Sequence, residues 1–112
     1  MLRTLLMVIV SVTAGGTSEP PQFARDVAPV LRRHCVGCHG PDEQNGGLRL
    51  DSYDALMRGG DSGPPVIPGN SWESLIIKKV DHRDKPTMPP KKKLAPSVVE
   101  PLRAWIDAGA RP

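Results

Sequence analysis

Two cysteines and a histidine form the most reactive group of side chains in the sequence. They stand together in residues 35–39, which read CVGCH. Two cysteines separated by two residues and followed at once by a histidine are the pattern for covalent attachment of a c-type haem (heme c). Each thiol can add to one vinyl group of the porphyrin, so we expect Cys35 and Cys38 to hold one haem covalently. His39 is then close enough to be the proximal iron ligand, and Gly37 is expected to leave room for the backbone at the porphyrin edge.

Other uses of two closely spaced cysteines fit the sequence less well. A zinc site needs about four ligands, usually with a second pair at similar spacing, but these are the only two cysteines, and the other histidines are His34 and His82. A thioredoxin-like redox pair would need strand–helix–strand patterning around it. A disulfide between Cys35 and Cys38 would close too small a loop to stabilise much, and it would leave His39 without a role.

A second candidate iron ligand lies in the proline-rich loop of residues 81–93, DHRDKPTMPPKKK. Proline fixes φ and removes a backbone donor, so Pro89 and Pro90 make a rigid arm that can hold the thioether of Met88 at a set distance. Met88 is therefore the expected distal iron ligand. His82 is the rival for that position.

Two further residues of these types are expected to be structural. Methionine most often fills gaps in a core, and Met57 lies in a predicted helix, so we interpret it as a core residue. His34 directly precedes Cys35. It is expected to be a solvated histidine at a helix end, where the helix dipole favours a positive charge.

The first predicted helix covers residues 23–34 and leads directly into the CVGCH segment. Its apolar residues recur at helical spacing on one face, namely Phe23, Val27, Val30 and Leu31. Pro29 lies inside this helix, which predicts a kink or a late start.

Two shorter helices are predicted in the middle of the chain. Ser52 is a suitable N-cap for residues 53–58, which end at a pair of glycines. Asn70 with Glu73 resembles a capping box, so a third helix is predicted from this point through about Val80. Its expected apolar residues are Trp72, Leu75, Ile76 and Ile77.

The last helix is predicted to end at Gly109, and its start is open to two interpretations. Ser97 as the N-cap places Pro101 in the first turn, where its missing N–H costs little. Ala95 as the N-cap would place Pro101 deeper and kink the helix. We prefer Ser97, and we expect this helix to pack on the first one beside the haem edge. Its apolar residues are Val98, Leu102, Trp105 and Ile106.

The chain is small and poor in aromatic residues for a core. It has 112 residues, with 13 Pro and 11 Gly but only one Phe, one Tyr and two Trp. Chains of this size often need a metal or a cofactor to be stable, and a buried porphyrin would supply the missing apolar mass. The composition therefore favours an all-α fold in which short helices and long loops surround one haem.

The N-terminus predicts export. Arg3 is a positive n-region, residues 5–12 are apolar, and residues 12–14 suit a cleavage site, so residues 1–14 are interpreted as a signal peptide with cleavage between 14 and 18. Residues 15–22 then form a disordered lead and residues 23–110 the domain. The apolar run is shorter than the about 20 residues that span a bilayer, so no membrane span is expected after cleavage. The expected location is periplasmic or otherwise exported.

The distribution of charge suggests a protein partner. The formal net charge is +3, and seven basic residues against two acidic ones lie between Lys78 and Lys93, on both sides of Met88. A basic surface there would steer a redox partner with an acidic docking face. Nucleic acid is not the expected target, because the protein is predicted to be exported and the cluster lacks interleaved aromatic residues. A monomer is expected.

Several motifs, taken in order, resemble the planctomycete-type cytochrome c domain. They are CVGCHGP, GGLRLDS, GGDSG, a Pro-Gly loop, MPP and LRAWIDAGA, and the resemblance covers about residues 23–110. It implies an all-helical class I-like cytochrome c fold, with haem on Cys35 and Cys38. It also implies that His39 is the proximal ligand and Met88 the distal ligand. Pro101 departs from the pattern, which has a continuous helix at that point.

The sequence as a whole predicts a periplasmic mono-haem electron carrier that cycles between ferric and ferrous iron. Two filled axial positions close the iron to substrates, so we expect no enzymatic activity. A haem-based sensor or ligand-binding module is the alternative if Met88 does not bind the iron. A further alternative is an electron-entry subunit that works within a larger oxidoreductase complex.

Overall fold

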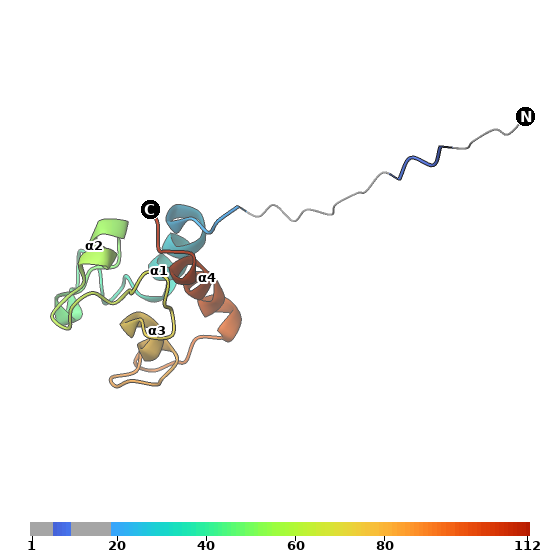
Figure 1. The fold of residues 1–112 in the computed structure, drawn as a ribbon. Helices are drawn as coiled ribbons and strands as arrows, with labels where there is room; N and C mark the ends of the chain where they lie inside the picture. The colour runs from blue at the N-terminus through green and yellow to red at the C-terminus, as the bar shows by residue number, and fades with distance from the viewer. Residues whose placement is uncertain (1–5, 10–18) are drawn as a thin grey trace, which may run out of the picture.

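Short helices and long irregular connections make up the fold (Figure 1). The computed structural model describes residues 6–9 and 19–112. Its elements, in order, are η1 (Phe23–Val27), α1 (Ala28–His34), η2 (Asn45–Gly47), α2 (Tyr53–Arg58), α3 (Leu75–Val80) and α4 (Pro96–Asp107). The described residues contain no β-strand, only two isolated bridges. The predicted all-α class with short helices and long loops is therefore confirmed.

The predicted signal peptide and lead fall largely on residues 1–5 and 10–18, which lie outside the described residues. Residues 6–9 have no regular secondary structure. No helix in the described part of the chain is both long enough and apolar enough to cross a membrane.

The helix predicted over residues 23–34 is present, but its first part is not an α-helix. η1 is a π-helical turn, and α1 continues from it with Pro29 in its first turn. Proline costs little there, because the first N–H groups of a helix have no partner within the helix. The late start that Pro29 predicts is therefore confirmed. Val27 and Leu31 of the predicted apolar face are fully buried.

The second helix, α2, has the predicted bounds and the predicted cap. The Ser52 hydroxyl accepts a hydrogen bond from the backbone N–H of Ala55 at 3.1 Å. Gly59 follows the helix with φ of 78°, a left-handed conformation that favours glycine. Met57 packs against the core from this helix, as predicted.

The third helix starts later than predicted, and this is a correction. The Asn70 side chain does accept a hydrogen bond from the Glu73 N–H at 3.2 Å, but α3 begins only at Leu75. Ser74 is fully buried, and its hydroxyl bonds both the N–H of Ile67 and the carbonyl of Asn70, each at 2.8 Å. These bonds hold residues 70–74 in a compact turn. Trp72 is consequently 59% exposed instead of facing the core as predicted.

The start of α4 is a second correction. The helix begins at Pro96 with Ala95 as its N-cap, so the preferred start at Ser97 is wrong. Proline fits the first helical position because its φ is already helical. The earlier start places Pro101 inside the helix, where it cannot donate the usual bond to the carbonyl four residues before it. The end of the helix, by contrast, agrees with the prediction.

The first and last helices pack together, as predicted. η1 and α1 both contact α4, and Figure 1 shows them side by side. The contact is built on three aromatic rings: the centroid of Phe23 lies 5.6 Å from those of Tyr53 and Trp105, and the latter two are 6.1 Å apart. The two pairs that include Tyr53, the first residue of α2, are edge-on, and the Phe23–Trp105 pair is tilted. Edge-on aromatic pairs at such distances add to the burial energy. Most of the few aromatic side chains are therefore used at this one junction.

Candidate cofactor-binding site

The CVGCH segment forms a tight turn at the end of α1. The backbone N–H groups of Cys35 and Val36 donate to the carbonyl of Leu31 at 2.8 and 2.9 Å, and the N–H of His39 donates to the carbonyl of Cys35 at 3.0 Å. The carbonyl of His39 then accepts from the N–H of Leu50 at 2.7 Å. The turn is therefore fixed at its start by α1 and at its end by the chain that leads to α2.

One cavity brings the predicted site residues together. It has a volume of about 340 Å³, and Cys35, Cys38, His39 and Met88 all line it. This volume is in the range of binding pockets for small molecules. Much of the remaining wall is apolar and includes Leu48, Leu50, Leu75, Ile76 and Val80. α4 contributes no residue to the lining, so of the two paired helices only α1 reaches the cavity, through His34.

His39 carries an unpaired buried atom. Its Nδ1 is buried and is the one such side-chain atom without a hydrogen-bond partner among the described residues. A buried polar atom without a partner is costly and needs an explanation. Imidazole is a common metal ligand, and the two thiols and the thioether share its cavity. These residues fit a covalently attached haem.

Cys35 and Cys38 are free thiols in different environments. Cys35 is half-buried and Cys38 is exposed. Burial, and to a smaller extent the neighbouring Cys38, raise the pKa of the Cys35 thiol to about 11. A thiol with so high a pKa stays protonated at neutral pH, whereas redox-active cysteines have a lowered pKa. The environment of Cys35 therefore disfavours a thioredoxin-like pair.

The structure separates the two candidates for the distal position. Met88 is half-buried and lines the cavity. His82 is exposed, has φ of 60°, and does not line the cavity. The geometry therefore favours Met88 as the residue that faces the bound group.

His34 differs from the prediction of a solvated helix-end residue. It is the last residue of α1, but it is half-buried and lines the same cavity. Burial lowers the pKa of His34, and the positive charges of Arg33 and Lys92 lower it further.

Two glycines, Gly40 and Gly60, allow close backbone contacts around the site. A Cβ at Gly40 would lie 2.4 Å from the carbonyl oxygen of Val36, and a Cβ at Gly60 would lie 2.4 Å from that of Gly46. A Cβ at Gly37 would meet no protein atom within 4 Å. Gly40 thus allows the turn after the cysteines, and Gly60 allows two loops of the cavity wall to touch. In the sequence, these two positions are marked only by the dipeptide GP at residues 40–41 and the tripeptide GGD at residues 59–61.

The basic segment of residues 78–93, which includes the end of α3 and the loop after it, is only partly neutralised. Three of its basic residues pair with nearby acids: Lys78 with Glu73, Lys79 with Asp84 and Arg83 with Asp81. Lys91, Lys92 and Lys93 are exposed and form no ion pair with any described residue. They directly follow Pro90, which lines the cavity. Free positive charge is therefore concentrated beside the cavity.

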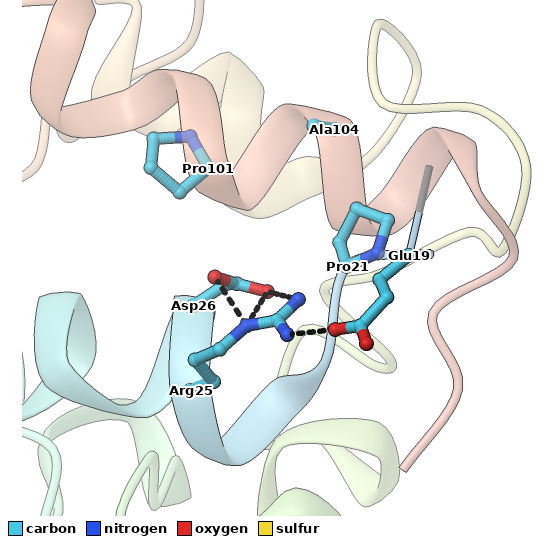
Figure 2. Close-up of a pocket in the computed structure, with 6 residues that line it drawn as sticks. All are labelled: Glu19, Pro21, Arg25, Asp26, Pro101 and Ala104. Atoms are coloured by element: carbon cyan, nitrogen blue, oxygen red, sulfur yellow. Dashed lines mark hydrogen bonds and ion pairs between the residues drawn. The ribbon is translucent and has the colours of Figure 1, made fainter. Parts of the chain in front are cut away.

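A second depression, of about 250 Å³, lies between η1 and α4 (Figure 2). Its charged groups satisfy one another, because Arg25 pairs with Glu19 at 2.9 Å and with Asp26 at 3.0 Å. The rest of its lining is Pro21, Pro101 and Ala104. It shares no residue with the cavity that holds the cysteines, and it offers no nucleophile or acid–base pair.

The sequence matches a known protein family. The sequence model of the family described as Planctomycete cytochrome C matches residues 35–92, slightly more than half of the 112 residues. The matched region begins at Cys35 and includes Met88. Curated proteins and solved structures gave no significant match.

Proposed function

Since the chain belongs to the Planctomycete cytochrome C family, we propose that it is a mono-haem electron carrier whose iron is bound by His39 and Met88. Members of cytochrome c families carry covalent haem and are typically electron carriers rather than enzymes. The family therefore supports haem-based electron transfer by this chain. The axial ligands and the location of the protein are our proposal.

The observation that carries the proposal is the meeting of four side chains in one cavity. Cys35, Cys38 and His39 come from the turn after α1, whereas Met88 comes from the loop after α3, yet all four line the same space. When bound, the haem supplies a one-electron couple between ferric and ferrous iron. The two thiols would anchor it by thioether bonds, and the His39 imidazole and the Met88 thioether would bind its iron.

The apolar residues that line the cavity also contribute to the proposed function. Ile76 and Val80 of α3 are almost fully buried and line the cavity together with Leu50. Such a wall keeps water away from the bound group, and exclusion of water is one of the means by which a protein sets a reduction potential. A methionine ligand favours a relatively high potential.

Export is part of the same proposal. Covalent haem is attached to c-type cytochromes outside the bacterial cytoplasm, and the N-terminal residues have the pattern of a signal peptide. A periplasmic location agrees with both features. A redox partner with an acidic docking face would be attracted by the exposed charges of Lys91, Lys92 and Lys93.

The decisive experiment measures covalent haem in exported protein. A pyridine haemochrome spectrum together with intact mass should report one haem per chain, joined through two thioether bonds. The double variant C35A/C38A should carry no haem that survives denaturing electrophoresis, whereas the parent protein should retain it. Covalent haem in the double variant would disprove the attachment site. Noncovalent haem in the parent protein would disprove the c-type assignment.

A further inference from the structure

One residue of α3 holds the segment that carries Met88. Lys79 lies in the last turn of α3, and its carbonyl oxygen accepts a hydrogen bond from the backbone N–H of Met88 at 3.1 Å. Its side chain reaches back to the same loop, where Nζ donates to the carbonyl oxygen of Lys85 at 2.6 Å. Residues 85–88 are thus bonded at both ends to Lys79.

The ammonium of Lys79 is well placed for a strong interaction. Its side chain is 18% exposed, and Nζ also pairs with a carboxylate oxygen of Asp84 at 3.2 Å. Hydrogen bonds from a charged donor are roughly twice as strong as neutral ones. The adjacent Lys78 differs, because its ammonium pairs only with Glu73, and those side chains are 33% and 51% exposed. Exposed pairs of that kind contribute little.

Few other bonds hold this segment. Pro86 has no N–H to donate, and the N–H of Lys85 is taken by the neighbouring Asp84 at 3.0 Å. Among the described residues, the hydrogen bonds that join residues 85–88 to the body of the protein all come from Lys79. Hydrogen bonding therefore ties this segment to α3 through Lys79 alone.

We propose that Lys79 is a positioning residue for Met88, and that its ammonium keeps the Met88 segment against the cavity. The inference rests on the proposed function, because it gives Met88 the role of an iron ligand. Lys79 lines the same cavity, but we assign it no bond to the iron. It acts through the loop, by making the open arrangement of residues 85–88 less favourable.

Competition by imidazole measures the open arrangement directly. A small ligand can replace Met88 only in molecules in which the loop has moved, so its apparent affinity rises in proportion to the open fraction. The weak red absorption band of ferric iron bound to a thioether reports the fraction in which Met88 is bound. This band should be present in the parent holoprotein and absent in M88A.

The test compares K79M with two other variants in this titration. K79M keeps an unbranched side chain but has no donor or charge, and it should bind imidazole about tenfold more tightly, the effect of losing one charge-assisted hydrogen bond. K78M removes the same charge one residue away and should bind imidazole as the parent does. K79R keeps the charge and should recover most of the difference. Haem content should be equal in all of them.

Two failures are distinguishable. Imidazole affinity of K79M equal to that of the parent would overturn the role of Lys79 and leave ligation by Met88 intact. Absence of the red band from the parent holoprotein would overturn ligation by Met88 and this inference with it. If K79M does not assemble with haem, K79Q is titrated with imidazole in its place. An imidazole affinity between those of K79R and M88A would support the inference. An affinity equal to that of the parent would oppose it.

Discussion

Asp107 at the end of α4 accepts two hydrogen bonds from Ser71, one from its backbone N–H at 2.8 Å and one from its hydroxyl at 2.9 Å. The neighbouring N–H of Gly69 donates to the carbonyl of Ile106 at 2.8 Å. The turn before α3 is therefore attached to the last helix, although the two lie far apart in the sequence. This attachment connects a cavity-lining helix to the part of the fold that does not line the cavity.

Removal of the Asp107 carboxylate should loosen this attachment. D107A leaves Ser71, which is buried, without partners for two donors, so we expect a loss of about 2 kcal/mol in the free energy of unfolding. D107N keeps one acceptor in place and should lose less. Denaturant unfolding of the two holoproteins, followed by far-ultraviolet circular dichroism, measures both. Equal stability of D107A and the parent would show that the bonds make no net contribution.

Gly37 within the CVGCH segment and Gly40 directly after it should respond differently to substitution by alanine. In G40A the new methyl group would overlap the backbone of Val36, and the turn would have to move, so we expect a cost of about 1–3 kcal/mol and a lower yield of holoprotein. G37A introduces the same group where no protein atom is near, and its holoprotein yield should be close to that of the parent. Equal yields of the two variants would contradict the structure of this turn.

Acid should weaken the start of η1. The hydrogen bonds from Arg25 lower the pKa of Asp26, and the backbone N–H of Gln22, 2.8 Å from the Asp26 carboxylate, lowers it further. Because the pKa is lower in the folded protein, the contribution of the charged carboxylate is present above its ordinary value of 3.8 and is lost as the pH falls through the folded value.

The D26N variant tests this dependence. Its stability should fall less steeply than that of the parent below about pH 5, where carboxylates begin to take up protons. E100Q is the control, because Glu100 is an exposed residue of α4 whose side chain has no hydrogen-bond partner among the described residues. Thermal unfolding of the holoproteins between pH 3 and pH 7 provides the measurement. Parallel curves for D26N and the parent would contradict the prediction.

The exposed lysines should control reactions with anionic partners. Changing Lys91, Lys92 and Lys93 to Glu should slow oxidation of the ferrous protein by hexacyanoferrate(III) at low ionic strength by about tenfold or more, because steering by charge is strong there and screened by salt. The red band should be unchanged. The control R58E/R111E alters charge at two residues that do not line the cavity. Equal stopped-flow rates for the triple variant and the parent would assign the lysines to solubility.

Local signals predicted local structure well. Ser52 and the glycine pair after Arg58 were enough to place α2, because a cap and a stop act on adjacent residues. The start of α3 could not be predicted in this way. It depends on the burial of Ser74 and on the bond between Ser71 and Asp107, two residues that are 36 positions apart in the sequence.

In the candidate site too, the features that depend on adjacent residues could be predicted, whereas those that depend on distant segments could not. The CVGCH segment carries its chemistry in five consecutive residues, and the two prolines after Met88 mark that methionine in the sequence. The wall of the cavity has no such signal, because residues such as Leu48 and Ile76 come to line the same cavity only when the chain folds. The two hydrogen bonds between Lys79 and the Met88 segment could not be predicted either, because in the sequence Lys79 looks like any other solvated lysine of a basic cluster.

The last residues of the chain are attached to the aromatic junction. The Tyr53 hydroxyl donates to the carbonyl of Ala110 at 2.9 Å, and the Trp105 indole N–H donates to that of Arg111 at 2.8 Å. A linker added after Pro112 would therefore start next to residues that are hydrogen-bonded to the domain, and not from a flexible terminal segment. Immobilisation on an electrode through such a linker should give one orientation of the domain, and hence one interfacial electron-transfer rate in place of a broad distribution.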